Sequence, residues 1–383
     1  MTHIEKNHRQ FIDSNTTISE PIYRIVEILR EQSIAPPGGD LGITKFNLAL
    51  SEILLNDTNV ATRVSTALEA RSLSRKSIKA RHIANLLLRV FNYVQIWNNQ
   101  QWDYPRLLDS VDEEESLNLW ITAIRNAMVS MDNDNCDTFF RLLEEKDTQT
   151  NIYQRGIAIP SIINQYFHSD AITIIDIGCS TNALLCGLAD KTAFLPVQDQ
   201  TNDQRINKYS PADMNIHAGI GVDLTDPHLI ENKMWQMACR YPREINTDNL
   251  SREWTHLIDD NCNEKITFVQ ANIVTTPLKF VHGTPADVIV FSTMLYQLEP
   301  EERNIALSKA RSLLSSKGII IIQDFAEYTN GEWHYTTDWG KKGAYRTYII
   351  DPENNILEAY QYDSGRCNEV YEGSDYDKVF ALN

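Results

Sequence analysis

Three polar residues, each near the end of an apolar run, could together hold a nucleotide-like ligand. They are Asp176, Asp223 and Asn272. Asp176 can hold an ammonium group, directly or through water. The carboxylate of Asp223 offers two acceptor oxygens to the hydroxyls of a ribose, and the amide of Asn272 can pair with the edge of an adenine. Leu224 and Ile273 would supply apolar walls. Each polar residue alone is more often a turn or capping residue, so the prediction depends on their common order.

The residues after Asp176 strengthen this interpretation. Gly178 has no Cβ atom, so the backbone can approach a ligand closely there. Small or turn-tolerant residues follow as far as Asn182, and an apolar helical pattern then covers 183–189. A buried strand, a tight turn and a helix N-terminus form a standard site for nucleotide-like ligands.

The elements that must position these residues begin at Ile172, where the pattern changes to alternating strands and helices. Apolar runs predict sheet strands at 172–177, 216–224, 266–273, 286–292 and 318–324, and helices at 227–240, 249–259 and 300–315. Two further runs, 345–350 and 356–362, flank a turn and predict an antiparallel pair. The predicted fold class is α/β, a Rossmann-like sheet with antiparallel C-terminal strands.

This order of elements is typical of a class I S-adenosylmethionine-dependent methyltransferase. A dinucleotide-binding fold would more naturally continue with parallel strands, and the G-x-G-x-x-G pattern of nicotinamide-dependent enzymes is absent from the turn after Asp176. The sulfonium cofactor has an amino-acid part, a ribose and an adenine. The turn at Gly178 would hold the amino-acid part, the carboxylate of Asp223 would bind the ribose, and the amide of Asn272 would bind the adenine.

The N-terminal part of the chain reads as an all-α region. Helical patterns cover about 20–31, 44–56, 59–72, 76–98, 116–130 and 136–146. We therefore predict two domains: a helical cap or substrate region at 1–147 and a cofactor-binding domain at 148–383. A basic cluster between Arg71 and Arg81 is expected to be a solvated helix start rather than an anion site.

Composition limits the class of partner. The formal net charge of -17 argues against nucleic acid and against an anionic membrane surface. No apolar run reaches the length that spans a bilayer, and the first residues lack the apolar core of a secretory signal. The six cysteines show no metal-ligand spacing, so we expect reduced thiols, no metal site and a cytoplasmic protein. The sequence leaves the oligomeric state open, a homodimer included.

Several spaced blocks carry a resemblance to a known family. They are Gln149-Thr-Asn-Ile-Tyr-Gln-Arg155, Asp176-Ile-Gly-Cys-Ser180, Gly221-Val-Asp-Leu-Thr-Asp-Pro227 and Ser292-Thr-Met-Leu-Tyr-Gln-Leu-Glu-Pro-Glu-Glu302. From about 148 to 314 the chain resembles methyltransferase-like proteins of a bacterial family catalogued as a domain of unknown function. The resemblance implies S-adenosylmethionine as the cofactor, held by Asp176, Gly178, Ser180, Asp223, Leu224, Asn272, Ile273 and Ser292.

The chain also departs from the pattern of that family. The usual methyltransferase turn has three glycines, whereas Ser180 and Asn182 stand at the second and third positions here. Asparagine adopts a positive φ more readily than most residues, so the turn can still form. Relatives carry a histidine where this chain has Phe291.

The acceptor side is less defined by the sequence. Tyr296 and His334 are the candidate catalytic residues, since either could deprotonate an oxygen or nitrogen acceptor, and Trp333 could form an aromatic wall. Methyl transfer can also proceed by positioning alone, because the donor is already activated. The long connection 190–215 is expected to form a flap or small hairpin near the cofactor edge.

The resulting hypothesis is S-adenosylmethionine-dependent methyl transfer to a small-molecule acceptor, a metabolite or natural product, at oxygen, nitrogen or carbon. A helical cap would favour a closed pocket and a small substrate. The alternatives are a non-catalytic binding module with a methyltransferase-like fold and, less favoured, a nicotinamide-dependent oxidoreductase.

Overall fold

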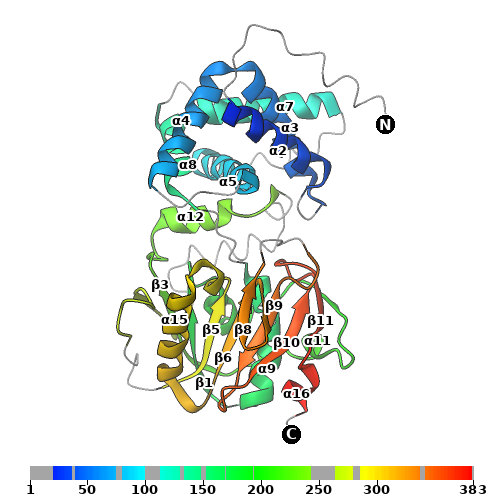
Figure 1. Cartoon of the computed structure of the whole chain (residues 1–383), viewed down its shortest axis with the longest axis vertical. Helices are drawn as coiled ribbons and strands as arrows, with labels where there is room; N and C mark the ends of the chain where they lie inside the picture. Colours follow the sequence, from blue (N-terminus) through cyan, green and yellow to red (C-terminus); the bar gives the residue numbers. More distant parts are fainter. Residues whose placement is uncertain are drawn as a thin grey trace. The chain divides into compact units, whose positions relative to one another are not determined.

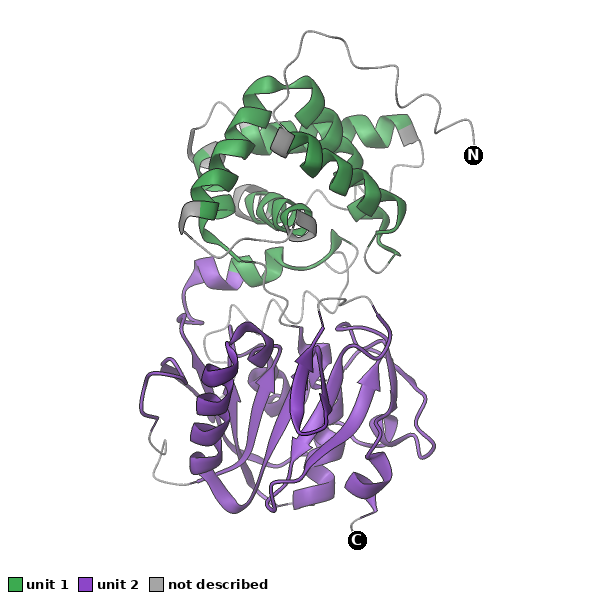
Figure 2. Ribbon diagram, in the orientation of Figure 1, with its two compact units in different colours: residues 1–150, 234–247 green, residues 151–233, 248–383 purple. Residues whose placement is uncertain are grey.

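The chain divides into two compact units in the computed structural model (Figure 2). Unit 1 comprises residues 1–150 and 234–247, and unit 2 comprises residues 151–233 and 248–383. The structure describes residues 20–36, 39–74, 80–99, 113–129, 133–147, 152–168, 170–192, 194–242, 264–278, 285–336 and 341–381. Unit 1 thus takes in a segment, 234–247, that the sequence assigned to the second domain.

The described part of unit 1 is helical, as predicted. Its helices are α2 (Glu20–Ile34), α3 (Leu41–Asn56), α4 (Thr58–Ser74), α5 (Ala80–Asn99), α7 (Glu113–Val129) and α8 (Asn133–Glu145). Asp40 begins α3, because its carboxylate accepts from the N–H groups of Gly42 and Ile43. Phe46, Phe91 and Trp120 are fully buried, and their ring centroids lie 5.4–6.4 Å apart.

Buried polar side chains bind helix ends within unit 1. The guanidinium of Arg71 donates to the carbonyls of Leu143, Glu144 and Lys146 at the end of α8, and it forms an ion pair with Asp147. Arg71 is 2% exposed, so it is a C-terminal helix cap rather than the predicted solvated residue. Residues 75–79 of the basic cluster lie outside the described residues.

A similar contact holds the segment 234–247 in unit 1. Side chains of α5 bind the backbone carbonyl groups at the C-terminal end of helix α12 (Ile230–Ala238). Asn92 donates to the carbonyl oxygens of Ala238 and Arg240 over 2.8 and 3.0 Å, and Arg89 donates to the carbonyl of Arg240 as well. These side chains satisfy the carbonyls that a helix leaves without partners at its end.

Unit 2 is built on a sheet of nine strands with the order β2-β11-β10-β9-β6-β5-β1-β3-β4 (Figure 1). The strands are β1 (Ile172–Ile177), β2 (Gln198–Asp199), β3 (Ile216–Asp223), β4 (Ile266–Gln270), β5 (Ala286–Ser292), β6 (Leu314–Asp324), β9 (Arg346–Ile350), β10 (Ile356–Tyr362) and β11 (Glu369–Glu372). The half from β4 to β6 is parallel, and β9, β10 and β11 follow as antiparallel neighbours.

Helices pack on both faces of this sheet, which is why its central strands are apolar throughout. Ile174 faces the core that α9 (Ile159–Phe167), α10 (Ala183–Ala189) and α16 (Tyr376–Phe380) complete. Ile175, the next residue, faces the core that α15 (Pro300–Leu313) completes. A hairpin of β7 (Ala326–Thr329) and β8 (Glu332–Tyr335) packs its aromatic side chains on the same face as α15.

The predicted fold class is confirmed: an α/β fold whose sheet has a parallel core and antiparallel C-terminal strands, with a helical region before it. The strand predicted at 286–292 has the same bounds in the structure, and β6 begins four residues earlier than predicted. The strand predicted at 266–273 ends at Gln270. The helix predicted at 249–259 lies outside the described residues.

The long connection between β1 and β3 does not form the predicted hairpin. It contributes the two-residue strand β2, which pairs with β11 at the opposite edge of the sheet from β4. The 3-10 turn η3 (Pro211–Asp213) and the short helix α11 (Arg205–Lys208) complete the connection. The pairing of β2 with a strand about 170 residues later is a long-range contact, which local patterning does not reveal.

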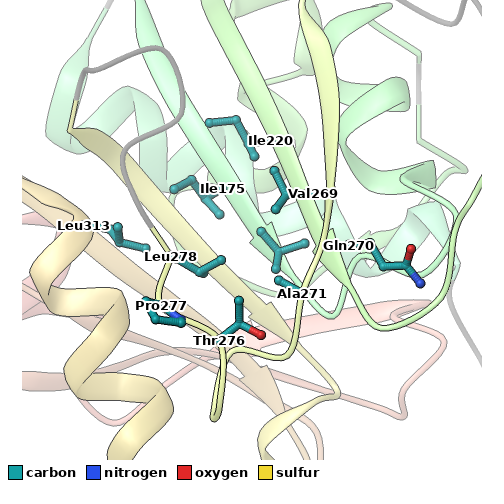
Figure 3. A pocket seen from close by; sticks show the side chains of 10 residues that line it. Ile175, Ile220, Val269, Gln270, Ala271, Thr276, Pro277, Leu278 and Leu313 are labelled. Atoms are coloured by element: carbon teal, nitrogen blue, oxygen red, sulfur yellow. The ribbon is translucent and has the colours of Figure 1, made fainter.

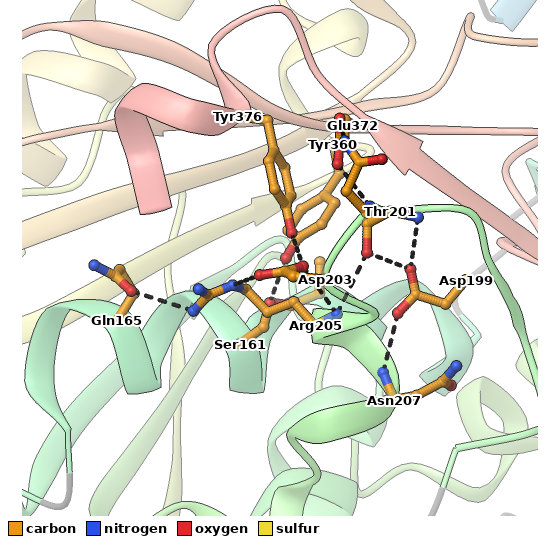
Figure 4. Close-up of polar contacts among 12 residues, drawn as sticks. Ser161, Gln165, Asp199, Thr201, Asp203, Arg205, Asn207, Tyr360, Glu372 and Tyr376 are labelled. Carbon is orange, nitrogen blue, oxygen red and sulfur yellow. Dashed lines mark hydrogen bonds and ion pairs between the residues drawn. The ribbon is translucent and has the colours of Figure 1, made fainter. Parts of the chain in front are cut away.

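A polar network fastens this connection to α9 and α16 (Figure 4). The carboxylate of Asp203 accepts from the phenol of Tyr376 over 2.5 Å and from Nε of Arg205 over 2.9 Å, and Arg205 also donates to the side chain of Gln165 over 3.2 Å. Burial alone would raise the pKa of Asp203, but the hydrogen bonds from Tyr376 and Arg205 outweigh it and lower that pKa. The connection is therefore an anchored part of unit 2 rather than a flap.

We expect the substitution Tyr376→Phe to lower the free energy of unfolding by about 1 kcal/mol, the usual net contribution of one hydrogen bond. Urea denaturation at pH 7 measures this loss. The substitution Tyr166→Phe on α9 is the matched control, because the hydroxyl of this half-buried tyrosine has no hydrogen-bond partner among the described residues. An equal loss in both variants would contradict the assigned role of Tyr376.

Candidate functional site

The candidate site lies where the strand order of the sheet reverses. From β1 the chain adds β3 and β4 on one side, and it adds β5 and β6 on the other. Open α/β sheets bind ligands at such a switch point, beside the carboxyl ends of the strands. Asp176 stands here, because in the parallel register it pairs with Gly221 of β3 and with Val290 of β5.

Asp176 is a buried carboxyl group that lacks a partner on one oxygen. Its side chain is 2% exposed, and its Oδ1 accepts no hydrogen bond. Burial, with a smaller contribution from the nearby charge of Asp223, raises the pKa of Asp176 to about 7. A buried acceptor without a donor is unfavourable in the isolated fold. A cationic donor group would relieve that cost.

The turn after β1 adopts left-handed backbone conformations at alternate residues. The φ angles are +81° at Gly178, +52° at Ser180 and +60° at Asn182. L-residues rarely adopt such angles, which explains why turns of this kind usually carry three glycines. The expectation that Asn182 can take a positive φ is confirmed.

Gly178 is tightly placed as well. A Cβ atom added there would lie 2.9 Å from Cγ of Met294, so the position admits no larger residue without movement. The N–H of Gly178 donates to the carbonyl of Val222 over 2.8 Å. The turn is thus fixed between β3 and the loop that follows β5.

Asp223 binds the turn from the end of β3. Its Oδ2 accepts from the N–H of Ser180 over 2.8 Å, and its Oδ1 accepts from the N–H and the hydroxyl of Thr225 over 3.2 Å each. A carboxylate has about four lone-pair sites, so these contacts leave little capacity for ribose hydroxyls. The next residue, Leu224, is 61% exposed, which matches the apolar surface expected beside an adenine.

Asn272 and Ile273 take different places from those predicted. The side-chain oxygen of Asn272 accepts from the N–H of Val274 over 2.8 Å, so it closes an Asx turn instead of projecting from a strand end. Ile273 is 3% exposed and belongs to the core on the α15 face. We therefore correct the assignment of Ile273 as an adenine wall, since a buried side chain offers no surface to a ligand.

An apolar pocket of ≈ 320 Å³ lies near these residues (Figure 3). Its lining residues are Ile175, Ile220, Val222, Val269, Gln270, Ala271, Thr276, Pro277, Leu278 and Leu313. Side chains alternate along a strand, so Ile175 and Asp176 point to opposite faces of the sheet. The pocket is therefore on the α15 face, and it contains no charged group that could orient a ligand.

The two predicted catalytic residues differ in their surroundings. Tyr296 lies in the turn η5 (Leu295–Gln297) directly after β5, and its backbone N–H donates to Oδ2 of Asp324 over 3.0 Å. His334 lies exposed on β8. Its neighbour Trp333 packs its ring against Tyr348 with the centroids 4.9 Å apart. Since neighbouring side chains on a strand point to opposite sides, His334 faces away from the sheet.

Two polar groups lie near the carboxyl end of the sheet: Asp324, for which the sequence predicted no definite role, and the half-buried Ser292, which the family resemblance placed at the cofactor. Asp324, at the end of β6, is 1% exposed, and burial raises its pKa to about 7 although it accepts two backbone N–H groups. Ser292 ends β5 and approaches the phenol of Tyr345. The position of Asp324 at a strand end was a signal of the same kind as that for Asp176 and Asp223.

Residues of the turn η2 (Tyr153–Ala158) form hydrogen bonds with three other segments of unit 2. Tyr153 donates its hydroxyl to the carbonyl of Thr192 over 2.5 Å, and the amide of Gln154 both donates to and accepts from the backbone of Leu195. Arg155 donates to the carbonyl of Gly365 over 3.0 Å and to the hydroxyl of Thr293 over 2.9 Å. These residues end the first block of the family resemblance, and the sequence did not predict their contacts.

Other features bear on the expected class of protein. Among the described residues, no helix is long and apolar enough to cross a membrane. Within the same ranges, no group of three or more histidine, cysteine or acidic side chains is placed to hold a metal ion. Cys179, Cys239 and Cys367 are buried thiols. Cys186 is disulfide-bonded, so the expectation of reduced thiols is wrong for that residue.

Comparisons with known proteins give distant structural likenesses. No family model matches the chain, and no curated protein matches its sequence. The N-methyltransferase NodS from Bradyrhizobium japonicum WM9, solved with S-adenosyl-L-homocysteine, is 14% identical over 46% of this chain and 63% of its own, with a TM-score of 0.25. PKMT2 from Rickettsia typhi, solved with the same ligand, is 14% identical over 45% of this chain and 25% of its own, with a TM-score of 0.26.

YjhP from E. coli is a third such structure, 13% identical over 47% of this chain and 52% of its own, with a TM-score of 0.27. The chain therefore spans less than two thirds of the length of each of these proteins. Similarity of this degree assigns neither a family nor an activity, and the resemblance to the bacterial family of unknown function stays a prediction.

One packing contact at the site gives a direct test. A Cβ atom at Gly221 would lie 1.7 Å from Oδ1 of Asn182, so we expect Gly221→Ala to destabilise the fold by about 1–3 kcal/mol through overpacking. Adding Asn182→Gly removes the nearest clashing atoms but leaves Sγ of Cys179 2.8 Å from the new Cβ atom, so it should restore part of that loss. Urea denaturation of both single variants and the double variant measures the coupling. Additive effects would contradict this placement of the Asn182 side chain.

Proposed function

We propose that the protein transfers a methyl group from S-adenosylmethionine to a small-molecule acceptor. The observation that carries this proposal is the buried carboxyl of Asp176, with one unpartnered oxygen, beside a turn of left-handed residues at the switch point of the sheet. The amino-acid part of this cofactor has an ammonium group, which suits that oxygen. Nicotinamide cofactors carry none.

The residues present fit the cofactor best at its amino-acid end. Asp176 would hold the ammonium, and the turn from Gly178 to Asn182 would lie along the amino-acid part. Asp223 would accept from a ribose hydroxyl with its remaining capacity, and the exposed side chain of Leu224 would cover one side of the adenine. Asn272 would then use its amide NH2 group, because its oxygen closes the Asx turn.

The bound cofactor would supply an activated methyl group, open to in-line attack by an oxygen, nitrogen or carbon atom. The chain would contribute by positioning the acceptor and excluding water. Tyr296 is the better placed of the two predicted catalytic residues, because it belongs to the loop whose Met294 packs on Gly178. His334 would act only on an acceptor that reaches the outer side of the β7–β8 hairpin.

Calorimetric titration with S-adenosylmethionine and with S-adenosylhomocysteine tests this proposal. We expect micromolar dissociation constants and no heat of binding with NAD. Absence of binding at millimolar cofactor would refute the proposal, whereas binding of NAD would favour an oxidoreductase. The release of S-adenosylhomocysteine on incubation with a library of small phenols, amines and carboxylic acids then separates an enzyme from a non-catalytic binding module.

A further inference from the structure

Three buried side-chain oxygens at the turn after β1 accept no hydrogen bond. They are Oδ1 of Asp176, Oγ1 of Thr181 and Oδ1 of Asn182, and each residue is at most 6% exposed. Folded proteins satisfy nearly all buried polar atoms, because each unsatisfied one is costly. Three within seven residues therefore indicate a place that a donor group fills.

The oxygen of Asn182 lies next to the side chain of Asp176. A Cβ atom at Gly221 would be 1.7 Å from Oδ1 of Asn182, so this oxygen sits directly over Gly221. Gly221 pairs with Asp176 in the register of β1 and β3. Neighbouring strands are about 4.8 Å apart, and paired residues point to the same face. The two oxygens thus occupy adjacent positions on one face of the sheet.

We propose that Asn182 forms an ammonium-binding subsite together with Asp176 and is therefore a determinant of cofactor affinity in this chain. The inference rests on the proposed function and adds a residue that a three-glycine turn would lack. An ammonium group has three donors and no acceptor, so it matches a set of acceptor oxygens. An amide oxygen also adds an acceptor without adding a third negative charge beside Asp176 and Asp223.

The backbone permits this exchange of glycine for asparagine. Asn182 has a φ of +60°, an angle that asparagine tolerates better than other non-glycine residues. Its N–H still donates to the carbonyl of Cys179 over 3.0 Å, and its carbonyl accepts from the N–H of Cys186 over 2.9 Å. The turn therefore keeps its form while the side chain contributes an oxygen to the subsite.

A titration with two ligands isolates the contact between Asn182 and the ammonium. S-adenosylhomocysteine carries the amino-acid part, whereas 5′-methylthioadenosine lacks it. We expect Asn182→Gly to weaken the affinity for S-adenosylhomocysteine by about 10-fold to 100-fold, the range for a hydrogen bond to a charged group. The affinity for 5′-methylthioadenosine should stay unchanged. Asn182→Asp keeps an acceptor at this position and should retain most of the affinity at pH 8.

Asn330→Gly is the matched control. Asn330 is exposed and has a φ of +54° in the turn between β7 and β8, so the same substitution is made at another left-handed asparagine. It should leave both affinities unchanged. The inference is overturned if Asn182→Gly lowers the affinities for both ligands equally or lowers neither affinity. If the wild-type chain binds neither ligand, the proposed function itself fails.

Discussion

The substitution Asp176→Asn should make the ligand-free protein more stable at pH 8 and at the same time weaken cofactor binding at least 100-fold. In the wild-type protein, the pKa of the Asp176 carboxyl group is about 7, above the value of about 3.9 for an aspartate in an unfolded chain. The folded state therefore holds the proton more tightly than the unfolded state. Stability is lost as pH rises from about 4 to 7, and above pH 7 the loss is complete. The shift of about 3 pKa units corresponds to about 4 kcal/mol at 1.36 kcal/mol per unit.

Asparagine removes this electrostatic cost and keeps the shape of the side chain. Urea denaturation at pH 8 and pH 5 measures the difference, and the gain should be larger at pH 8. Asp377→Asn, at an exposed position of α16, should change stability little at either pH. Cofactor affinity should fall at least 100-fold, because the ammonium loses its counter-charge. A destabilised Asp176→Asn variant that still binds the cofactor would contradict both parts of the prediction.

Cofactor affinity should rise with pH through neutrality. Only the ionised carboxylate of Asp176 pairs with an ammonium, and in the free protein this group ionises with a pKa of about 7. Below pH 7, binding must displace the proton, so the association constant should fall by up to tenfold per pH unit. Titrations with S-adenosylhomocysteine between pH 5.5 and 8.5 measure this slope.

A second buried carboxyl could produce the same profile and must be separated from the first. Burial also raises the pKa of Asp324 to about 7, but its two oxygens accept the N–H groups of Phe325 and Tyr296. We therefore expect Asp324→Asn to keep the pH dependence of affinity and Asp176→Asn to remove it. The reverse result would move the ammonium-binding role to Asp324.

Much of the parallel core was accessible from the sequence, because strands buried on both faces are continuous apolar runs. The runs at β1 and β5 have the predicted bounds, and the strand-end positions of Asp176 and Asp223 followed from them. The Asx turn of Asn272 was less accessible. An Asn after an apolar run is compatible with a ligand contact and with a local turn, and only the backbone geometry distinguishes the two.

The remaining features depend on contacts between distant parts of the chain. The insertion pairs with β11, and Arg155 reaches the carbonyl of Gly365 across 210 residues. No local pattern encodes such pairs. One missed feature was readable: Asn330-Gly331, both with positive φ, joins β7 to β8 as a two-residue hairpin turn. This dipeptide is a strong hairpin signal, and with it the outward direction of His334 could have been anticipated.

The return of the chain to unit 1 has a consequence for how the protein is made. Side chains of α5 bind the carbonyls of Ala238 and Arg240, and Trp235 donates to the carbonyl of Asp147. A ribosome has already synthesised β1 and β3 when these partners emerge. The helical unit therefore cannot complete these contacts before β1 and β3 have been synthesised, so we expect the two units to fold on the ribosome as interleaved rather than successive events.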